Sequence, residues 1–200
     1  MTESLVLTKT YAAPPIDRTE ILRYAGMRGH SDEIAELLEQ CIREADGAFA
    51  YRVCWSTFPI KEVGSELDLT FAHVCSKDLQ AHLAGCGEIV VFAATVGLEI
   101  DRLVARTNPL SPAKALLFNA LGTERIEALC DAFETEVKAM VEKNEKALQR
   151  RFSPGYGDLP LELQREIVAA LDCQRKIGLA LNQSLLLSPS KSVTAIIGIQ

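Results

Sequence analysis

The chain has 200 residues, of which 48% are hydrophobic and 24% are charged, and its formal net charge is −6. This length suits one domain with a buried core, and this composition excludes a disordered chain. The negative charge and the absence of a Lys/Arg cluster argue against a nucleic-acid binder or a membrane-surface protein. No apolar run is long enough to span a membrane, and residues 1–4 lack the features of a signal peptide, so we expect a cytoplasmic protein.

The six cysteines are scattered along the chain without a C-x-x-C pair, and the three histidines show no metal-ligand spacing. Without an export signal, we expect reduced and mostly buried thiols rather than a disulfide framework. We expect no metal site, because close-spaced ligand pairs are missing.

Residues 1–47 are expected to form a helical segment that precedes the main body of one domain, residues 48–200. The elements expected in this segment are a short edge strand at 5–7, a helix capped by Asp17 that ends at Gly26 or Gly29, and a helix over 32–45 that is capped by Ser31.

From residue 49 onward the hydrophobic period changes, because aromatic and β-branched residues become frequent and apolar positions alternate. We expect strands over 49–58 and 67–71, paired as a hairpin or lying side by side. The continuous apolar run at 88–95 predicts a central strand that is covered on both faces. Short helices are expected over 76–83 and 98–106.

One long helix is expected from Ser111–Pro112, which supply an N-cap with proline at the first helical position, to about Gln149. Its predicted inward stripe consists of Leu116, Leu117, Leu121, Ile126, Leu129, Cys130, Phe133, Val137, Met140 and Val141. Helices are then expected over 161–171 and 172–177, followed by strands over 179–187 and 193–199. This order of elements favours the α+β class over a doubly wound sheet.

The run from Arg151 to Gly157 (Arg-Phe-Ser-Pro-Gly-Tyr-Gly) is the candidate ligand loop, and we expect it to lie between two helices. Pro154 fixes its own φ, and Gly155 and Gly157 allow a left-handed backbone without a Cβ in the way of a ligand. Arg151 offers a fork for a carboxylate or phosphate, and Tyr156 offers an aromatic face and a hydroxyl. The alternative is an ordinary Pro-Gly turn with a solvated arginine.

Two acids of the long helix are candidates for the opposite side of this site. Glu127 and Asp131 lie one turn apart and share a face. Together with Arg151 and Tyr156 they suit a small zwitterionic ligand, because the arginine can take its carboxylate and an acid its ammonium group. The alternative for each acid is a solvated helix face. The sequence has no Walker loop, dinucleotide fingerprint, nucleophile elbow or metal-binding helix motif.

Several segments in order resemble the activation domain of cobalamin-dependent methionine synthase. They are Arg151-x-x-Pro154-Gly155-Tyr156, Gly178-x-x-Leu181-x-x-Ser184, Pro189-x-x-Ser192-Val193, the segment 92–99, and the helix 120–129 with Glu127. The resemblance covers nearly the whole chain. Segments 21–26 and 76–79 look most like free-standing members of that family.

The resemblance implies an α+β fold with a twisted antiparallel sheet flanked by helices, and a shallow groove that binds S-adenosylmethionine. It implies that the chain acts in trans on the cobalamin-binding domain of a methionine synthase or another corrinoid protein, without being a complete enzyme alone. Reactivation would use a flavodoxin-like electron donor and a methyl group from S-adenosylmethionine. No nucleic acid or membrane partner is expected, and no catalytic residue is assigned.

By the same resemblance, Arg151 would hold the methionyl carboxylate, and the backbone at Ser153 and Gly155 would contact the adenosine part. Tyr156 would lie near the sulfonium. Glu127 would be the helix acid, with Asp131 as the alternative.

The sequence departs from the family in several places: it has no Asp-Trp segment near its start, Asn182-Gln183 replaces Thr-Glu, and Leu187 replaces methionine. Two other functions therefore stay open. One is an adaptor that docks on a corrinoid protein without binding S-adenosylmethionine productively, and the other is a methyltransferase with a different substrate.

Overall fold

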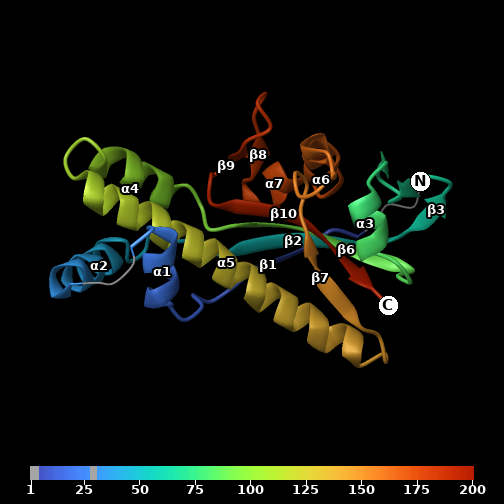
Figure 1. Ribbon diagram of the computed structural model, residues 1–200, viewed down its shortest axis with the longest axis horizontal. Coiled ribbons are helices and arrows are strands. Elements are labelled where there is room, and N and C mark those ends of the chain that lie inside the picture. The colour runs from blue at the N-terminus through green and yellow to red at the C-terminus, as the bar shows by residue number, and fades with distance from the viewer. Residues whose placement is uncertain (1–4, 28–30) are drawn as a thin grey trace.

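A five-stranded antiparallel sheet and a long helix across it form the centre of the computed structural model, which describes residues 5–27 and 31–200 (Figure 1). The strands, in spatial order, are β1 (Leu7–Thr10), β2 (Arg52–Pro59), β6 (Glu88–Thr95), β10 (Ser192–Ile199) and β7 (Leu148–Phe152). Helix α5 (Pro112–Glu142) runs diagonally across one side of this sheet. The predicted α+β class is confirmed.

Successive side chains of the two central strands point to opposite faces of the sheet, so the core has two layers. In β6, Val90 and Phe92 point into one hydrophobic cluster, whereas Ile89 and Val91 point into the other. The first layer contains α5 together with α1 (Arg18–Tyr24), α2 (Asp32–Glu44) and α4 (Glu99–Thr107). The second contains α3 (Lys77–His82), a 3-10 turn (Leu161–Leu163), α6 (Gln164–Ala170) and α7 (Cys173–Ile177). The central strand at 88–95, covered on both faces, is therefore as predicted.

Two small sheets replace strands that the sequence predicts as longer. The segment 67–71 contributes only to β4 (Glu66–Asp68), which pairs with β3 (Lys61–Val63) and β5 (His73–Val74) and not with the strand that begins at Arg52. The expected pairing of 49–58 with 67–71, as a hairpin or as adjacent strands, is therefore wrong. The expected strand over 179–187 is also wrong, because β8 (Ala180–Leu181) turns back onto β9 (Leu187–Ser188). The side chain of Asn182 accepts hydrogen bonds from the backbone N–H groups of Ser184 and Leu186 and stabilises this turn.

The N-terminal elements follow the prediction closely. The edge strand lies two residues later than expected, and Asp17 caps α1 by accepting from the backbone N–H groups of Thr19 and Glu20. Gly26 follows α1 with a φ of 71°, whereas Gly29 lies outside the described residues. Ser31 is the N-cap of α2, but its side chain makes no capping hydrogen bond.

Helix α5 ends earlier than predicted. It stops at Glu142, Glu145 takes a left-handed φ of 59°, and the chain then enters strand β7 instead of continuing as a helix to Gln149. Arg151 and Phe152 therefore belong to a strand, so the candidate loop does not lie between two helices. Leu116 and Met140, at 43% and 46% exposure, are wrongly placed in the inward stripe. The correctly placed residues are Leu117, Leu121, Ile126, Leu129, Cys130, Phe133 and Val137, which are buried, and Val141, which is partly buried.

Four of the six cysteines are buried, in agreement with the prediction of mostly buried thiols: Cys41, Cys54, Cys130 and Cys173. Burial raises the pKa of the Cys41 thiol to about 11, which suits an inert core residue. Over residues 5–27 and 31–200, no helix has the length and apolar character needed to cross a bilayer.

A buried ion pair attaches the N-terminal connector to α5. Arg125 and Glu124 are only 1% and 4% exposed, and the guanidinium donates both to the Glu124 carboxylate and to the backbone oxygens of Pro14 and Pro15, at 2.5 and 2.6 Å. The backbone N–H of Asp17 completes the set by donating to Glu124 Oε1 at 3.0 Å. Every polar atom of the pair therefore has a partner, which offsets the cost of burying two charges.

Replacing Arg125 with methionine should lower the free energy of unfolding by about 3–5 kcal/mol, because Glu124 would stay buried without its cation. The matched control is Arg102→Met, which removes an exposed i,i+3 ion pair with Glu99. It should lower the free energy of unfolding by about 1 kcal/mol or less. Urea unfolding followed by circular dichroism measures both. Equal losses in the two variants would contradict the structural role of the buried pair.

Candidate functional site

Strand β7 directs Arg151 toward α5 and Phe152 toward the other layer. Arg151 lies opposite Ile197 of β10, whose side chain belongs to the α5 layer, and Phe152 lies opposite Ile196. The Arg151 guanidinium donates to Glu127 Oε2 at 2.7 Å and to Asp131 Oδ1 at 2.9 Å, and it also pairs with Glu134. The structure therefore brings together the arginine and both acids that the sequence singles out.

Glu134 is the member of this cluster that the sequence analysis missed. It follows Glu127 and Asp131 at i+7 and i+3, so all three carboxylates lie on one face of α5. That spacing was the signal in the sequence that could have identified Glu134.

Burial by itself would lower the pKa of Arg151, but the hydrogen bonds to Asp131 and Glu134 outweigh it and raise that pKa above its usual value. Arg151 is therefore a permanent cation inside an acidic cluster.

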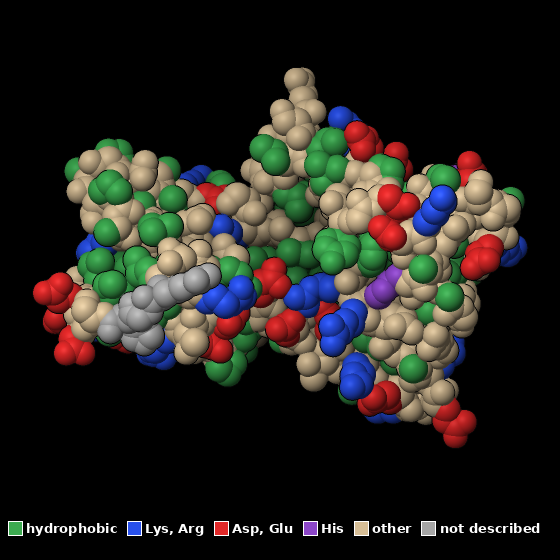
Figure 2. All heavy atoms as spheres, viewed as in Figure 1, with side chains coloured by type: hydrophobic (Ala, Val, Ile, Leu, Met, Phe, Trp, Pro, Cys, Tyr) green, Lys and Arg blue, Asp and Glu red, His purple; other side chains and the backbone are tan. Residues whose placement is uncertain are grey.

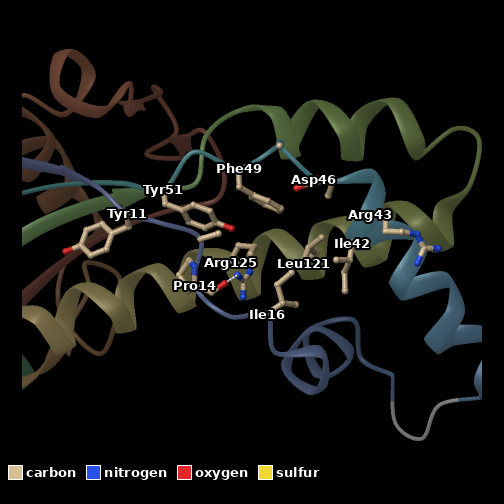
Figure 3. Close-up of a pocket in the computed structure, with 13 residues that line it drawn as sticks. Tyr11, Pro14, Ile16, Ile42, Arg43, Asp46, Phe49, Tyr51, Leu121 and Arg125 are labelled. Atoms are coloured by element: carbon tan, nitrogen blue, oxygen red, sulfur yellow. Dashed lines mark hydrogen bonds between the residues drawn. The ribbon is translucent and has the colours of Figure 1, made fainter.

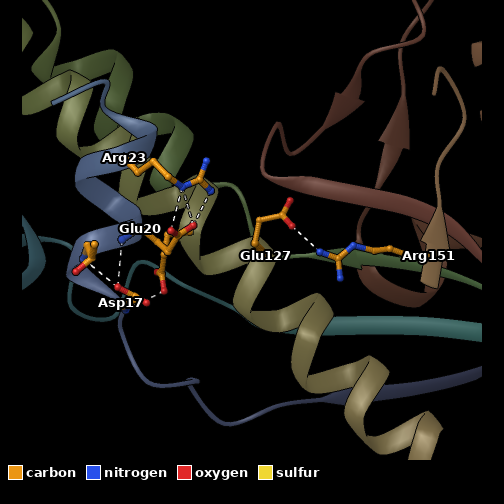
Figure 4. A network of polar contacts seen from close by, with 7 residues as sticks. Asp17, Glu20, Arg23, Glu127 and Arg151 are labelled. Carbon is orange, nitrogen blue, oxygen red and sulfur yellow. Dashed lines mark hydrogen bonds and ion pairs between the residues drawn. The ribbon is translucent and has the colours of Figure 1, made fainter. Parts of the chain in front are cut away.

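A groove of about 420 Å³ lies between α1 and α5, and Glu127 and Asp131 belong to its wall. Figure 4 shows Glu127 of α5 directed toward Arg151, with Asp17 and Glu20 on the α1 side. The other wall carries Asp17, Glu20 and Tyr24, and Glu124 lies between the two. Burial raises the pKa of the Tyr24 phenol, and the nearby Glu127 carboxylate adds to this shift, so the hydroxyl stays protonated. Two acids at the start of α1, the N-cap Asp17 and Glu20 in the first turn, therefore line this wall.

Carboxylates outnumber cations around the groove. Asp17, Glu20, Glu124, Glu127, Asp131 and Glu134 lie in it or beside it, and the cations paired with them are Arg23, Arg125 and Arg151. In Figure 2, acidic and basic side chains adjoin one another over the middle of this face, where α5 and β7 run. The excess negative charge favours a ligand that carries a positive group.

The loop after β7 turns back sharply. The Gly155 N–H donates to the Leu159 carbonyl at 2.9 Å, the Tyr156 N–H donates to the Ser153 carbonyl at 3.1 Å, and Gly155 has a φ of 86°. The Tyr156 side chain is 71% exposed, and its ring packs edge-on against Phe152 at 5.4 Å between centroids. Ser153 and Gly155 thus follow the arginine in one tight turn.

Helix α3 holds this loop in place. The Asp158 carboxylate accepts from the Ser76 hydroxyl and from the backbone N–H groups of Lys77 and Asp78, at 2.8 and 3.2 Å. In return, the Asp78 carboxylate accepts from the Asp158 N–H at 3.1 Å and occupies the place where a Cβ on Gly157 would stand. The hydrogen bond from Ser76, followed by those from the backbone, lowers the pKa of Asp158. This reciprocal contact explains why the loop needs glycine at position 157.

The predicted site residues therefore fall into two groups. Arg151, Glu127 and Asp131 contact one another, whereas the Tyr156 ring lies beside Phe152, whose side chain belongs to the second layer. Within the described ranges, no hydrogen bond connects the Tyr156 hydroxyl with Arg151 or with either acid.

Comparison with solved structures finds the MetH reactivation domain bound to AdoHcy, with a TM-score of 0.71 over 98% of this chain and 79% of that one. The chain has the fold of the MetH reactivation domain. The two sequences are 18% identical, so the likeness establishes the fold, and AdoHcy is a ligand of the MetH domain. No protein-family model matches the chain, and no curated protein matches it either.

The lowered pKa of Asp158 predicts a pH-dependent contribution to stability. Its ionised form is favoured by folding, so the contribution is present above the ordinary aspartate pKa of 3.8 and is lost as the pH falls through the lower folded value. At neutral pH, Asp158→Asn should melt at a lower temperature than the wild type, and this gap should close under acidic conditions.

Differential scanning calorimetry at several pH values measures the gap, with Glu162→Gln, an exposed acid, as the control that should change little. A gap that stays the same from neutral to acidic pH would contradict the role assigned to the Asp158 carboxylate.

Proposed function

We propose that residues 1–200 act as one module that binds S-adenosylmethionine in the α1–α5 groove and supports reactivation of a cobalamin-dependent methionine synthase on a separate chain. The observation that carries the proposal is the carboxylate-lined groove beside Arg151, on the fold of a domain that is bound to AdoHcy. We place this activity in the cytoplasm.

Charge is the main reason for assigning this ligand. S-adenosylmethionine carries a sulfonium and an ammonium group, and both are cations that the acid-rich groove would attract. Glu127 and Asp131 would bind the ammonium group, and Arg151 would pair with the carboxylate through its planar fork. Because the guanidinium already contacts three carboxylates, ligand binding would exchange at least one of them.

The loop after Arg151 would bind the adenosine part. Ser153 and Gly155 follow Arg151 within four residues of the chain, and hydrogen bonds between Asp158 and the start of α3 anchor the same turn. The exposed ring of Tyr156 would contribute a contact near the sulfonium if the ligand extends along this loop.

The chain's own contribution would be binding and orientation of the methyl donor. Cobalamin, bound by the partner protein, would supply the cobalt centre that accepts the methyl group, with the electron coming from a flavodoxin-like donor. A loop anchored on α3 and an acidic groove can hold the sulfonium methyl toward such a partner, which is a positioning role.

An adaptor that docks on a corrinoid protein without productive ligand binding is the second candidate. The specific observation in its favour is that Arg151 is occupied by its own three acids. A ligand carboxylate would have to compete with these contacts, which lowers the affinity for S-adenosylmethionine.

S-adenosylmethionine should raise the melting temperature of the wild-type protein by several degrees, since a ligand at about 100 times its Kd stabilises the folded state by about 2.7 kcal/mol. Arg151→Ala should abolish this shift. Arg150→Ala is the matched control, because Arg150 is an exposed neighbour whose backbone carbonyl makes its contact with His82. A full ligand shift in Arg151→Ala would overturn the assignment of the groove.

Reactivation is tested with a partner that carries oxidised cobalamin, a flavodoxin-type donor and S-adenosylmethionine. The chain should restore methionine synthesis, and Arg151→Ala should lower the initial rate at least tenfold. Recovery of the partner in a pull-down, together with no heat of ligand binding and no reactivation, would instead support the adaptor.

A further inference from the structure

A second cavity, of about 670 Å³, is lined by the N-terminal connector, the end of α2, the segment before β2, and α5 (Figure 3). The connector around Pro14 lines both spaces, whereas Arg125 lines the cavity and Glu124 lines the groove. The buried Arg125–Glu124 pair therefore separates them. Nothing in the proposed function uses this cavity.

Aromatic and aliphatic side chains form most of its wall. The rings of Phe49 and Tyr51 are nearly parallel, with 6.0 Å between centroids and 28° between planes, and Tyr11 lies farther along the same wall. Ile16, Ile42 and Leu121 supply the aliphatic part. A cavity of this volume, lined by rings and a few polar groups, has the dimensions of a small-molecule site.

The polar groups are balanced in charge. Arg125 is neutralised by Glu124, and Arg43 and Asp46 contribute one charge of each sign. Four of the five N–H groups of Arg125 donate to Glu124, Pro14 and Pro15, and the guanidinium also has the Tyr51 hydroxyl as a hydrogen-bonding neighbour. The hydroxyl of Tyr51 lies beside this guanidinium, and although burial raises the pKa of that phenol, Arg125 opposes the shift.

We propose that this cavity binds a neutral, planar heteroaromatic molecule that lies against Phe49 and Tyr51. Its ring nitrogen or carbonyl would accept a hydrogen bond from the Tyr51 hydroxyl, whose oxygen faces the Arg125 guanidinium. The flat walls select a planar ring, because stacked and edge-on aromatic contacts add to the burial of apolar area. The charged side chains of the cavity already neutralise one another. An ionic ligand is therefore disfavoured, because no unpaired charge in the cavity would compensate for its lost hydration.

Quinoxaline is the probe, because it is neutral, bicyclic and planar and has two acceptor nitrogens. Saturation-transfer NMR and competition titrations on the full chain measure its binding, with cyclohexanol as the saturated control and benzoate as the anionic control. Quinoxaline should bind at least tenfold more tightly than either control.

Tryptophan substitutions at two neighbouring alanines test whether quinoxaline binds in this cavity. Ala13 is exposed and lines the cavity, so Ala13→Trp should fill it from the connector without disturbing the core and should weaken quinoxaline binding at least tenfold. Ala12→Trp is the matched control, because Ala12 is exposed on the same connector and does not line the cavity. Arg151→Ala should leave quinoxaline binding unchanged, which separates this test from the proposed function.

The proposal is overturned if quinoxaline binds no better than cyclohexanol, or if benzoate binds more tightly. An equal loss of quinoxaline affinity in Ala12→Trp and Ala13→Trp would also overturn the proposal. Loss of quinoxaline binding in Arg151→Ala would overturn it too, because the probe would then lie in the α1–α5 groove.

Discussion

The contact of Arg151 with three carboxylates of α5 is the constraint on which the site depends. Glu127, Asp131 and Glu134 share one helix face and would repel one another without a cation between them. Arg151 is only partly exposed, so water screens this cluster less than it screens a fully solvated ion pair. The contact holds edge strand β7 against α5, sets the position of the loop that follows, and leaves the α1–α5 groove with an acidic wall.

Hydrophobic periodicity in the sequence predicts the helices and strands whose residues are buried at regular intervals. It does not predict elements that are fixed by pairing with residues far away in the sequence. The run at 88–95 and the caps Asp17 and Ser111 were sufficient to place β6, α1 and the start of α5. Apart from Asn144, residues 143–149 are good helix formers, but Leu148 pairs with Ile199 of β10, and this long-range pairing overrides local propensity. Asn144, next to the left-handed Glu145, was the local signal that the helix ends early.

The candidate site was predictable where it depends on helix geometry. The one-turn spacing of Glu127 and Asp131 placed both on one face, and the structure brings Arg151 to that face. The assumption that the long helix reached Gln149 hid the alternation of β7, which directs Arg151 and Phe152 to opposite layers and leaves Tyr156 beside Phe152. The walls contributed by α1 and by the buried Arg125–Glu124 pair arise from packing of segments more than 100 residues apart, which spacing alone does not reveal.

A crystal structure of the chain grown with saturating S-adenosylmethionine tests the central claim most directly. The account predicts ligand density between α1 and α5, with the methionyl carboxylate on the Arg151 guanidinium, the ammonium group beside Glu127 or Asp131, and at least one of the three ion pairs broken. Ligand density in any other part of the molecule, with all three ion pairs of Arg151 intact, would contradict it.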